Sequence, residues 1–486
     1  MFSILHISDL HRSQAEPMDN KSLVAALVAD RDRYVVETPR VPPPTAIVIS
    51  GDLIEGAAID AENWEETIRE QYKVTRAFLN ELCTLFLDGD KRRMIVTPGN
   101  HDVCWNTSRQ AMEIVPKSKY PSDIFASLTQ PGSNYRWSWR ELTLYRIVNE
   151  TMYQQRMDLY WDFVESFYQD VDLQFPLERK RGFQLFDLFE RRVLIAAFDS
   201  IYGNDCYNFA GSVAPGSVGS CAIKLREMAH DYELQIALWH HSIQGPPLHS
   251  DYMNSSQIQE MIAHGFQLGL HGHQHFAGTL TQYIHLDESR TMAVVGAGSL
   301  CAGVNQLPRG QDRQYNLLVI EDDLIRARVH VREMGDGGQF TRKRSGAFLN
   351  GFVEVSWFPQ INVMGEKLDT KESNDRRTID AAEDALRSGK PKEAIELLKA
   401  TDINSYPHAK RLLLNSLLSE QRWHTIIEVI GTPADIDEAV TLVTALTREG
   451  RFDEAQGRLD AEVEIDPGTR QELQERLSTE QLMRQS

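Results

Sequence analysis

The stretch FSILHISDLH, residues 2–11, joins an apolar run to two polar side chains. Its first part, Phe2 to His6, has the length and the β-branched character of a buried strand. Asp9 and His11 follow directly, one residue apart. Taken alone, this pattern is explained more simply by a helix cap at Ser8 or Asp9 with a surface histidine beside it. A functional site at the strand end therefore requires partners elsewhere in the chain.

The same arrangement recurs at five further places. Five short apolar runs, each predicted as a strand, end in carboxylate, amide or imidazole side chains: 46–50 before Gly51-Asp52, 93–97 before Gly99-Asn100-His101-Asp102, 193–198 before Asp199-Ser200, 234–239 before His240-His241, and 265–270 before the histidines of 271–275. Between the early strands, residues 64–87 carry apolar side chains at helical spacing. Alternation of strand and helix predicts a mainly parallel α/β core, in which the strand ends share one rim.

The side chains at these strand ends indicate a metal centre. Aspartate, histidine and asparagine without any thiolate suit Mn²⁺, iron or a catalytic Zn²⁺ better than a structural zinc. About seven such groups are too many for one ion, so two ions that share a bridging carboxylate are expected. A two-metal centre of this kind supplies a nucleophile and stabilises negative charge at a phosphoryl group.

Five of the motifs, in this order, resemble the signature of the calcineurin-like metallophosphoesterases, which reads DxH, GDxxD/E, GNHD/E, H and GHxH. Here they are Asp9-x-His11, Gly51-Asp52-x-x-Glu55, Gly99-Asn100-His101-Asp102, His240 and Gly272-His273-x-His275. The resemblance covers roughly residues 1–335 and is greatest to the cyclic-nucleotide phosphodiesterase branch. It implies a four-layer α-β-β-α sandwich and a hydrolase acting on phosphoesters.

The resemblance also implies a role for each motif residue. One ion would be bound by Asp9, His11 and His275, the other by Asn100, His240 and His273, with Asp52 as the bridge. His101 would be the general acid that protonates the leaving alkoxide, and Asp102 would orient its imidazole. The doublet leaves open whether His240 or His241 is the ligand. Mn²⁺ is the expected metal, with iron or zinc as alternatives.

The catalytic domain is expected over residues 1–350, with an insertion over 103–190. The insertion is rich in tryptophan, tyrosine and phenylalanine, including Tyr153, Tyr160, Phe163 and Phe167 at helical spacing. We expect a helical cap whose core is made by these rings. The alternative is that some of them line the cleft and stack on a base.

A linker is expected over residues 351–370, followed by an all-helical domain over 371–486. Within this domain, Gly389, Gln421 and Gly450 occupy equivalent points of three similar segments, 32 and 29 residues apart. The segments resemble tetratricopeptide repeats, whose helical pairs stack into a surface for a protein partner or for a second copy of the chain. The alternative is a helical bundle that only supports the catalytic domain.

Composition limits the possible functions. The net charge of −19 argues against wrapping of nucleic acid by neutralisation of its phosphates. Five scattered cysteines without a CxxC pair and the lack of a long apolar run favour a cytoplasmic protein that does not contact membranes. We therefore expect a two-metal phosphodiesterase acting on a phosphodiester, with nucleotides and nucleic acids as candidate substrates. A metal-dependent nuclease and a scaffold protein with a relic metal site are the alternatives.

Overall fold

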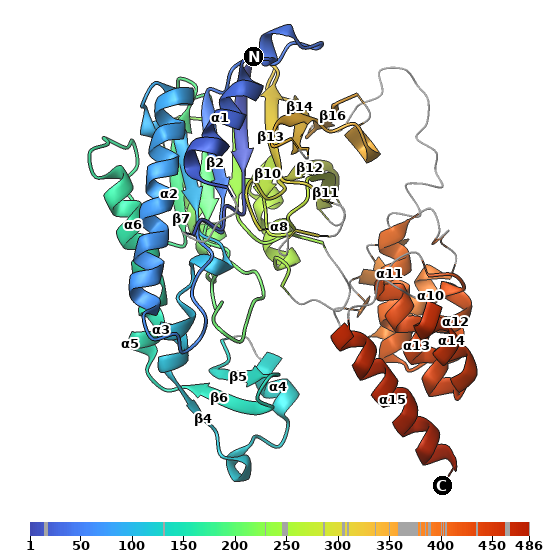
Figure 1. Cartoon of the computed structure of the whole chain (residues 1–486). Helices are drawn as coiled ribbons and strands as arrows, with labels where there is room; N and C mark the ends of the chain where they lie inside the picture. The colour runs from blue at the N-terminus through green and yellow to red at the C-terminus, as the bar shows by residue number, and fades with distance from the viewer. Residues whose placement is uncertain are drawn as a thin grey trace. The chain divides into compact units, whose positions relative to one another are not determined.

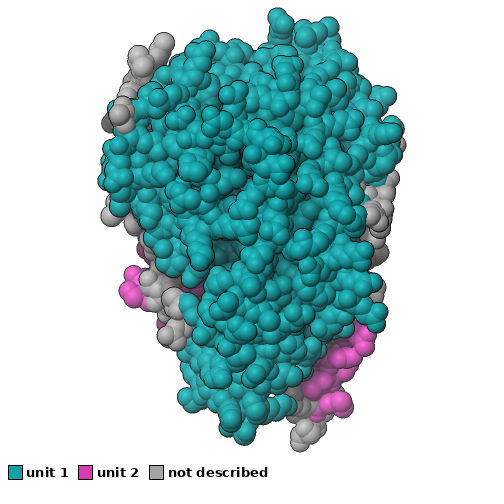
Figure 2. All heavy atoms as spheres, turned by 90° about the vertical axis from the view of Figure 1, so that its left-hand side faces the viewer, with its two compact units in different colours: residues 1–245, 250–360 teal, residues 246–249, 361–486 magenta. Residues whose placement is uncertain are grey.

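The computed structural model describes most of the chain, and its two compact units are coloured separately in Figure 2. The first unit contains residues 1–245 and 250–360, and the second contains 246–249 and 361–486. The described residues are 1–13, 18–129, 132–228, 230–244, 251–284, 287–303, 307–308, 311–335, 337–348, 350–357, 378–379, 381–383, 385–386, 390–399, 401, 403, 406–433, 436–461 and 467–485.

The first sheet holds the three earliest strands of the chain. Its order is β15-β14-β13-β1-β2-β3, and β16 pairs with β14. β1, β2 and β3 are parallel to one another, whereas β13 runs antiparallel to β1. The strands are β1 (Phe2–Ile7), β2 (Ala46–Ser50), β3 (Met94–Thr97), β13 (Gln314–Ile320), β14 (Arg326–Met334), β15 (Phe340–Arg342) and β16 (Phe352–Ser356).

The second sheet has the order β11-β12-β10-β9-β8-β7. β8, β9, β10 and β12 are parallel, and the outer strands β7 and β11 are antiparallel to their neighbours. The strands are β7 (Phe183–Leu188), β8 (Val193–Phe198), β9 (Leu234–Leu238), β10 (Leu268–His271), β11 (Gly278–Ile284) and β12 (Asp287–Gly296). All six predicted strands that end in polar residues are therefore present, distributed over two sheets.

Helices cover the outer faces of the two sheets (Figure 1). α1 (Asn20–Arg31), α2 (Trp64–Leu87) and α6 (Asp158–Tyr168) share one apolar core with both sheets, and α7 (Ser217–Glu227) and α8 (Ser255–Ala263) pack on the second sheet. α2 has the predicted bounds, because its apolar side chains form one buried stripe and the chain turns at Asp88 with a left-handed φ of 54°. The predicted four-layer α-β-β-α sandwich is confirmed.

The insertion contains more strand than we expected. β4 (Met112–Ile114), β6 (Thr143–Ile147) and β5 (Tyr135–Ser138) form a separate antiparallel sheet beside the short helices α3 (Trp105–Gln110), α4 (Ile124–Thr129) and α5 (Glu150–Gln154). In β5 buried and half-buried residues alternate, which is the pattern of a strand with one covered face. The rings of α6 are buried in the main core, as the core interpretation of these aromatics predicted.

The predicted linker begins too early. Residues 352–356 form β16, which pairs with β14, and so belong to the first unit, while 358–370 lie outside the described residues. In the second unit each helix packs on the next one in sequence. These helices are α10 (Pro391–Leu398), α11 (Pro407–Ser419), α12 (Trp423–Ile430), α13 (Ile436–Glu449), α14 (Phe452–Ala461) and α15 (Pro467–Gln485). Among the described residues, no helix combines the length and the apolar character needed to cross a bilayer.

Candidate metal centre

The predicted site residues come from both sheets and meet at one edge of the sandwich. Asp9, Asp52 and Asn100 follow β1, β2 and β3, whereas His240 follows β9, and His273 and His275 follow β10. Because these strands are parallel within each sheet, their carboxyl ends converge. Five of the predicted ligands have left-handed backbone conformations, namely Asp9, His11, Asp52, His273 and His275, with φ between 42° and 77°. Such strain is typical of functional sites.

Four of these residues form the first cluster. His11 Nε2 lies 3.2 Å from His275 Nε2, and His275 Nε2 lies 3.3 Å from Asp9 Oδ1. Asp52 Oδ2 is 3.7 Å from His11 Nε2. The four candidate ligand atoms lie within 4.8 Å of one another, and only His275 is partly exposed. Two imidazoles and two carboxylates at this spacing can hold one divalent ion.

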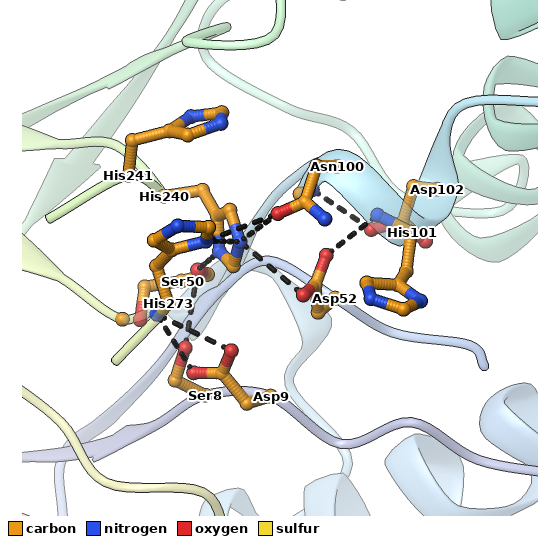
Figure 3. A network of polar contacts seen from close by, with 12 residues as sticks. Ser8, Asp9, Ser50, Asp52, Asn100, His101, Asp102, His240, His241 and His273 are labelled. Carbon is orange, nitrogen blue, oxygen red and sulfur yellow. Dashed lines mark hydrogen bonds and ion pairs between the residues drawn. The ribbon is translucent and has the colours of Figure 1, made fainter. Parts of the chain in front are cut away.

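The second cluster contains Asn100, His240 and His273 (Figure 3). Asn100 Oδ1 lies 3.0 Å from His240 Nε2 and 3.1 Å from His273 Nδ1, and Asp52 Oδ2 lies 3.3 Å from the same Nε2. The opposite nitrogen of His240, Nδ1, is 2.7 Å from the Ser50 carbonyl oxygen and must donate to it. The Nε2 of a neutral His240 therefore presents a lone pair to two oxygens, an arrangement that a cation between them stabilises.

Electrostatics supports cation binding at this edge. Burial, together with the neighbouring His101, lowers the pKa of His11 to about 3. For His240 the effect of burial is outweighed by the Asp52 carboxylate, which raises the pKa to about 9. The surrounding histidines, His240 foremost, hold the pKa of Asp52 well below its usual value despite burial. Asp9 and Asp52, whose pKa values are both lowered, are therefore ionised, and they attract either protons or metal ions to the nitrogens that face them.

Two motif glycines explain how the loops approach so closely. A Cβ at Gly99 would lie 2.2 Å from Asp52 Oδ1, and a Cβ at Gly272 would lie 1.7 Å from the Ser8 hydroxyl oxygen. Both distances are far below contact, so any side chain at these positions would displace a neighbouring loop. The absence of a side chain at Gly99 thus leaves space for Asp52, and its absence at Gly272 leaves space for Ser8.

His101 and Asp102 lie on the side of Asp52 away from His240 (Figure 3). The backbone N–H of His101 donates to Asp52 Oδ1 at 2.8 Å. The ring nitrogen Nδ1 of His101 lies 2.8 Å from the Glu55 carbonyl oxygen. The structure corrects the role expected for Asp102. Its carboxylate accepts the N–H groups of Gly99 and Leu53 and the hydroxyl of Tyr72, so it holds the two motif loops together.

The structure distinguishes between the two histidines of the doublet. His240 Nε2 faces Asn100 and Asp52 in the second cluster, whereas the ring of His241 lies beside the rings of His240 and His273, with centroids 5.2 and 4.9 Å away (Figure 3). His241 Nδ1 lies 3.0 Å from the Ser200 hydroxyl, which also accepts the N–H of His240. Ser200, the last residue of its motif, therefore fixes the doublet rather than facing the cluster.

One residue of the site had no sequence signal. Asp251 Oδ2 lies 3.1 Å from His273 Nε2, the ring nitrogen opposite the one that faces the cluster. A carboxylate in this position orients a ligating imidazole and increases its basicity. Asp251 follows no predicted strand and lies 22 residues before His273, so spacing alone could not identify it.

Comparison with known families identifies the family to which this chain belongs. The model of the family described as calcineurin-like phosphoesterase matches residues 2–277, which is more than half of the chain. This chain belongs to the calcineurin-like phosphoesterase family. The fold and the metal-capable residues of this phosphoesterase are accordingly those of a metal-dependent phosphoester hydrolase.

Several solved structures are similar to this phosphoesterase. A dimetal phosphatase from Danio rerio has 12% sequence identity and a TM-score of 0.39, over 73% of this chain and 99% of that one. The calcineurin-like phosphoesterase YfkN from Bacillus subtilis has 12% identity and a TM-score of 0.31, over 77% and 96%. Vps29 from Chaetomium thermophilum has 9% identity and a TM-score of 0.27, over 74% and 100%. No curated protein matches the sequence.

Proposed function

We propose that this phosphoesterase hydrolyses phosphodiesters at a centre of two divalent ions, with Mn²⁺ as the preferred metal. In this proposal Asp9, His11 and His275 bind one ion, and Asn100, His240 and His273 bind the other. The observation that carries the proposal is the position of Asp52. Its Oδ2 is 3.7 Å from His11 Nε2 and 3.3 Å from His240 Nε2, as expected of a carboxylate shared by two ions.

When bound, two ions activate a water molecule for attack on phosphorus and stabilise charge on the phosphoryl oxygens. The chain itself supplies the acid. Because His101 Nδ1 faces the Glu55 carbonyl oxygen, that nitrogen carries one proton, and the general acid is the imidazolium, whose second proton on Nε2 passes to the leaving oxygen. In hydrolysis of a diester, such an acid protonates the alkoxide that is released. Asp102 does not contact the substrate in this proposal; it positions the loop that carries His101 by accepting the N–H groups of Gly99 and Leu53.

We also propose that the second unit is an interaction domain of tetratricopeptide type, which binds a protein partner or a second copy of the chain. Gln421 and Gly450 both have left-handed backbone conformations, with φ of 53° and 78°, at the turns between α11 and α12 and between α13 and α14. The two residues align in the sequence repeat, which supports a repeating helical pair. Gly389, the third equivalent position, lies outside the described residues.

The test of the metal centre compares the two neighbouring histidines. His240→Ala should reduce the bound metal and abolish hydrolysis of an aryl phosphodiester, whereas His241→Ala should retain both ions. Elemental analysis and the rate with added Mn²⁺ measure the two effects. Equal losses in both variants would refute the assignment of His240.

Faster cleavage of duplex DNA than of the small diester would favour the nuclease, although the net charge of −19 opposes duplex binding.

A further inference from the structure

A row of aromatic rings leads from the first metal cluster to the protein surface. The rings of His11 and His101 meet edge to face with centroids 4.6 Å apart. The His101 ring is 5.8 Å from that of Trp105, which in turn is 5.6 Å from that of Phe209. The indole of Trp105 and the phenyl ring of Phe209 therefore continue the row of rings outward from the imidazole of the proposed acid. In the proposed function, a leaving group that His101 protonates departs beside these rings.

Trp105 is held firmly in place. It is the first residue of α3 and packs in part on two apolar clusters of the first unit. The next residue, Asn106, is buried and links α3 to the loop between β2 and α2, since its side chain accepts the N–H of Asp60 and donates to the Ala58 carbonyl oxygen. The indole is thus fixed by the backbone around it.

Phe209 reaches the same place from a different segment. It is 40% exposed, although it lies on a loop with many internal hydrogen bonds. Asp205 accepts the N–H groups of Tyr207 and Asn208, and its carboxylate is bound by the buried Arg136 of β5. At Gly211 the loop passes so close to His241 that a Cβ there would lie 2.5 Å from the imidazole. A rigid loop against the metal centre thus exposes a phenyl ring to solvent.

We propose that Trp105 and Phe209 form a stacking subsite for a planar ring on the leaving side of the substrate. Adjoining aromatic rings beside a few polar groups are the usual lining of a ligand site. Uncharged aromatic faces bind aryl groups and nucleobases by stacking, without regard to the identity of the base. This inference rests on the proposed function and names its substrate class, which is aryl or nucleotide-type diesters in preference to alkyl diesters.

The test measures binding of matched phosphonates to the Mn²⁺-loaded full chain by titration calorimetry. Phenylphosphonate and methylphosphonate have the same charged group and differ only in the ring. Phe209→Ala and Trp105→Ala should raise the Kd of phenylphosphonate about fivefold or more, the effect expected for one stacked ring, and leave that of methylphosphonate unchanged. Trp105→Phe should retain most of the affinity. A second pair, AMP and ribose 5-phosphate, shows whether a nucleobase uses the subsite as a phenyl ring does.

Tyr202→Ala is the matched control. Tyr202 is 43% exposed, like Phe209, but it lines a different cavity of about 650 Å³ together with Trp161 and Asp199. Selective loss of phenylphosphonate in this variant would overturn the proposal, because the ring would then occupy that cavity. Equal weakening of both phosphonates in Phe209→Ala, or no weakening, would overturn it as well. Because Phe209 is exposed, its variant should fold even if Trp105→Ala does not.

Hydrolysis of an aryl diester by the unaltered protein separates this inference from the proposed function. If that hydrolysis occurs but neither Trp105→Ala nor Phe209→Ala changes the ratio of the Kd values of phenylphosphonate and methylphosphonate, the proposed subsite is refuted and the proposed phosphodiesterase activity is retained. If no ester is hydrolysed but the ratio changes as expected, the subsite stands and the activity must be revised.

Discussion

Asp52→Asn tests the shared carboxylate with a minimal change of shape. Asparagine retains an oxygen that can accept the His101 N–H, which now donates to Asp52 Oδ1 at 2.8 Å. Its amide nitrogen replaces Oδ2, the atom that faces His11 and His240, and an amide nitrogen has no lone pair to offer a metal. The Asp52 side chain is only 2% exposed. Because asparagine has nearly the same shape, the substitution should change the atoms offered to the metal ions while the loop keeps its position.

The expected magnitude follows from the position of Asp52 between both clusters. Loss of a group that only orients a ligand costs about 10- to 100-fold in metal affinity. Asp52 is itself a proposed ligand of both ions, so we expect a loss of at least about 100-fold, or ~2.8 kcal/mol. Asp251→Asn is the graded comparison, because Asp251 contacts only the outer nitrogen of His273. Its effect should stay within the 10- to 100-fold range given for such partners.

Metal-dependent stabilisation provides the assay. At a Mn²⁺ concentration of about 100 times its Kd, binding raises the free energy of unfolding of the unaltered protein by ~2.7 kcal/mol. At the same concentration a variant with a Kd about 100-fold higher gains only ~0.4 kcal/mol. Chemical denaturation with and without Mn²⁺ should show this difference, and elemental analysis should show fewer ions per chain. An Asp52→Asn protein that binds two ions and keeps the full stabilisation would refute the bridging role.

Four further results are expected. His101→Ala should keep both ions yet lose about 10²- to 10⁴-fold in kcat for an aryl diester, as for loss of a general acid, and an ion-free variant would contradict this role. Tyr72→Phe should lower the free energy of unfolding by about 1 kcal/mol in urea denaturation, because it removes the hydroxyl that donates to Asp102, and an unchanged midpoint would show that this bond is not needed. A chain shortened to residues 1–360 should fold and hydrolyse a small aryl diester, since every proposed ligand lies in the first unit; an inert soluble product would disprove the independence of that unit. Burial lowers the pKa of His330 to about 3, so below the ordinary pKa of 6.5 only the unfolded chain binds a proton at this residue, and the free energy of unfolding decreases as the pH is lowered. His330→Leu should remove about 2 to 3 kcal/mol of this decrease between pH 7 and 4.5. Curves of the free energy of unfolding against pH that run parallel for the two proteins would argue against the shift.

The strand ends could be predicted because their signal is local. A short apolar run followed by glycine and a carboxylate or histidine predicts a buried strand with polar residues at its end, and the structure confirms the strands β1, β2 and β3. The bounds of α2 were equally predictable, since a buried stripe of apolar residues continues through 24 residues. Both features depend on neighbours in the sequence, so one chain suffices to read them.

Other features depend on contacts between distant segments. The strands of the insertion have only three to five residues, too few for a clear periodicity, and β16 becomes a strand because β14 offers it an edge. The role of Asp102 could not be read from its place beside His101, because adjacent residues in a turn point in different directions. Its partners Leu53 and Tyr72 are 49 and 30 residues away. Asp251 and Phe209 were missed for the same reason.

The central place of β1 in its sheet has a consequence for synthesis on the ribosome. β1 emerges long before its neighbour β13, which spans Gln314–Ile320, and His11 must wait for His275, which is 264 residues later. Until more than 300 residues after β1 have been translated, one edge of β1 has no native partner and is open to pairing with other chains. We therefore expect the nascent chain to need protection from aggregation late into its synthesis, and its first uptake of metal to mark the moment at which the two sheets close.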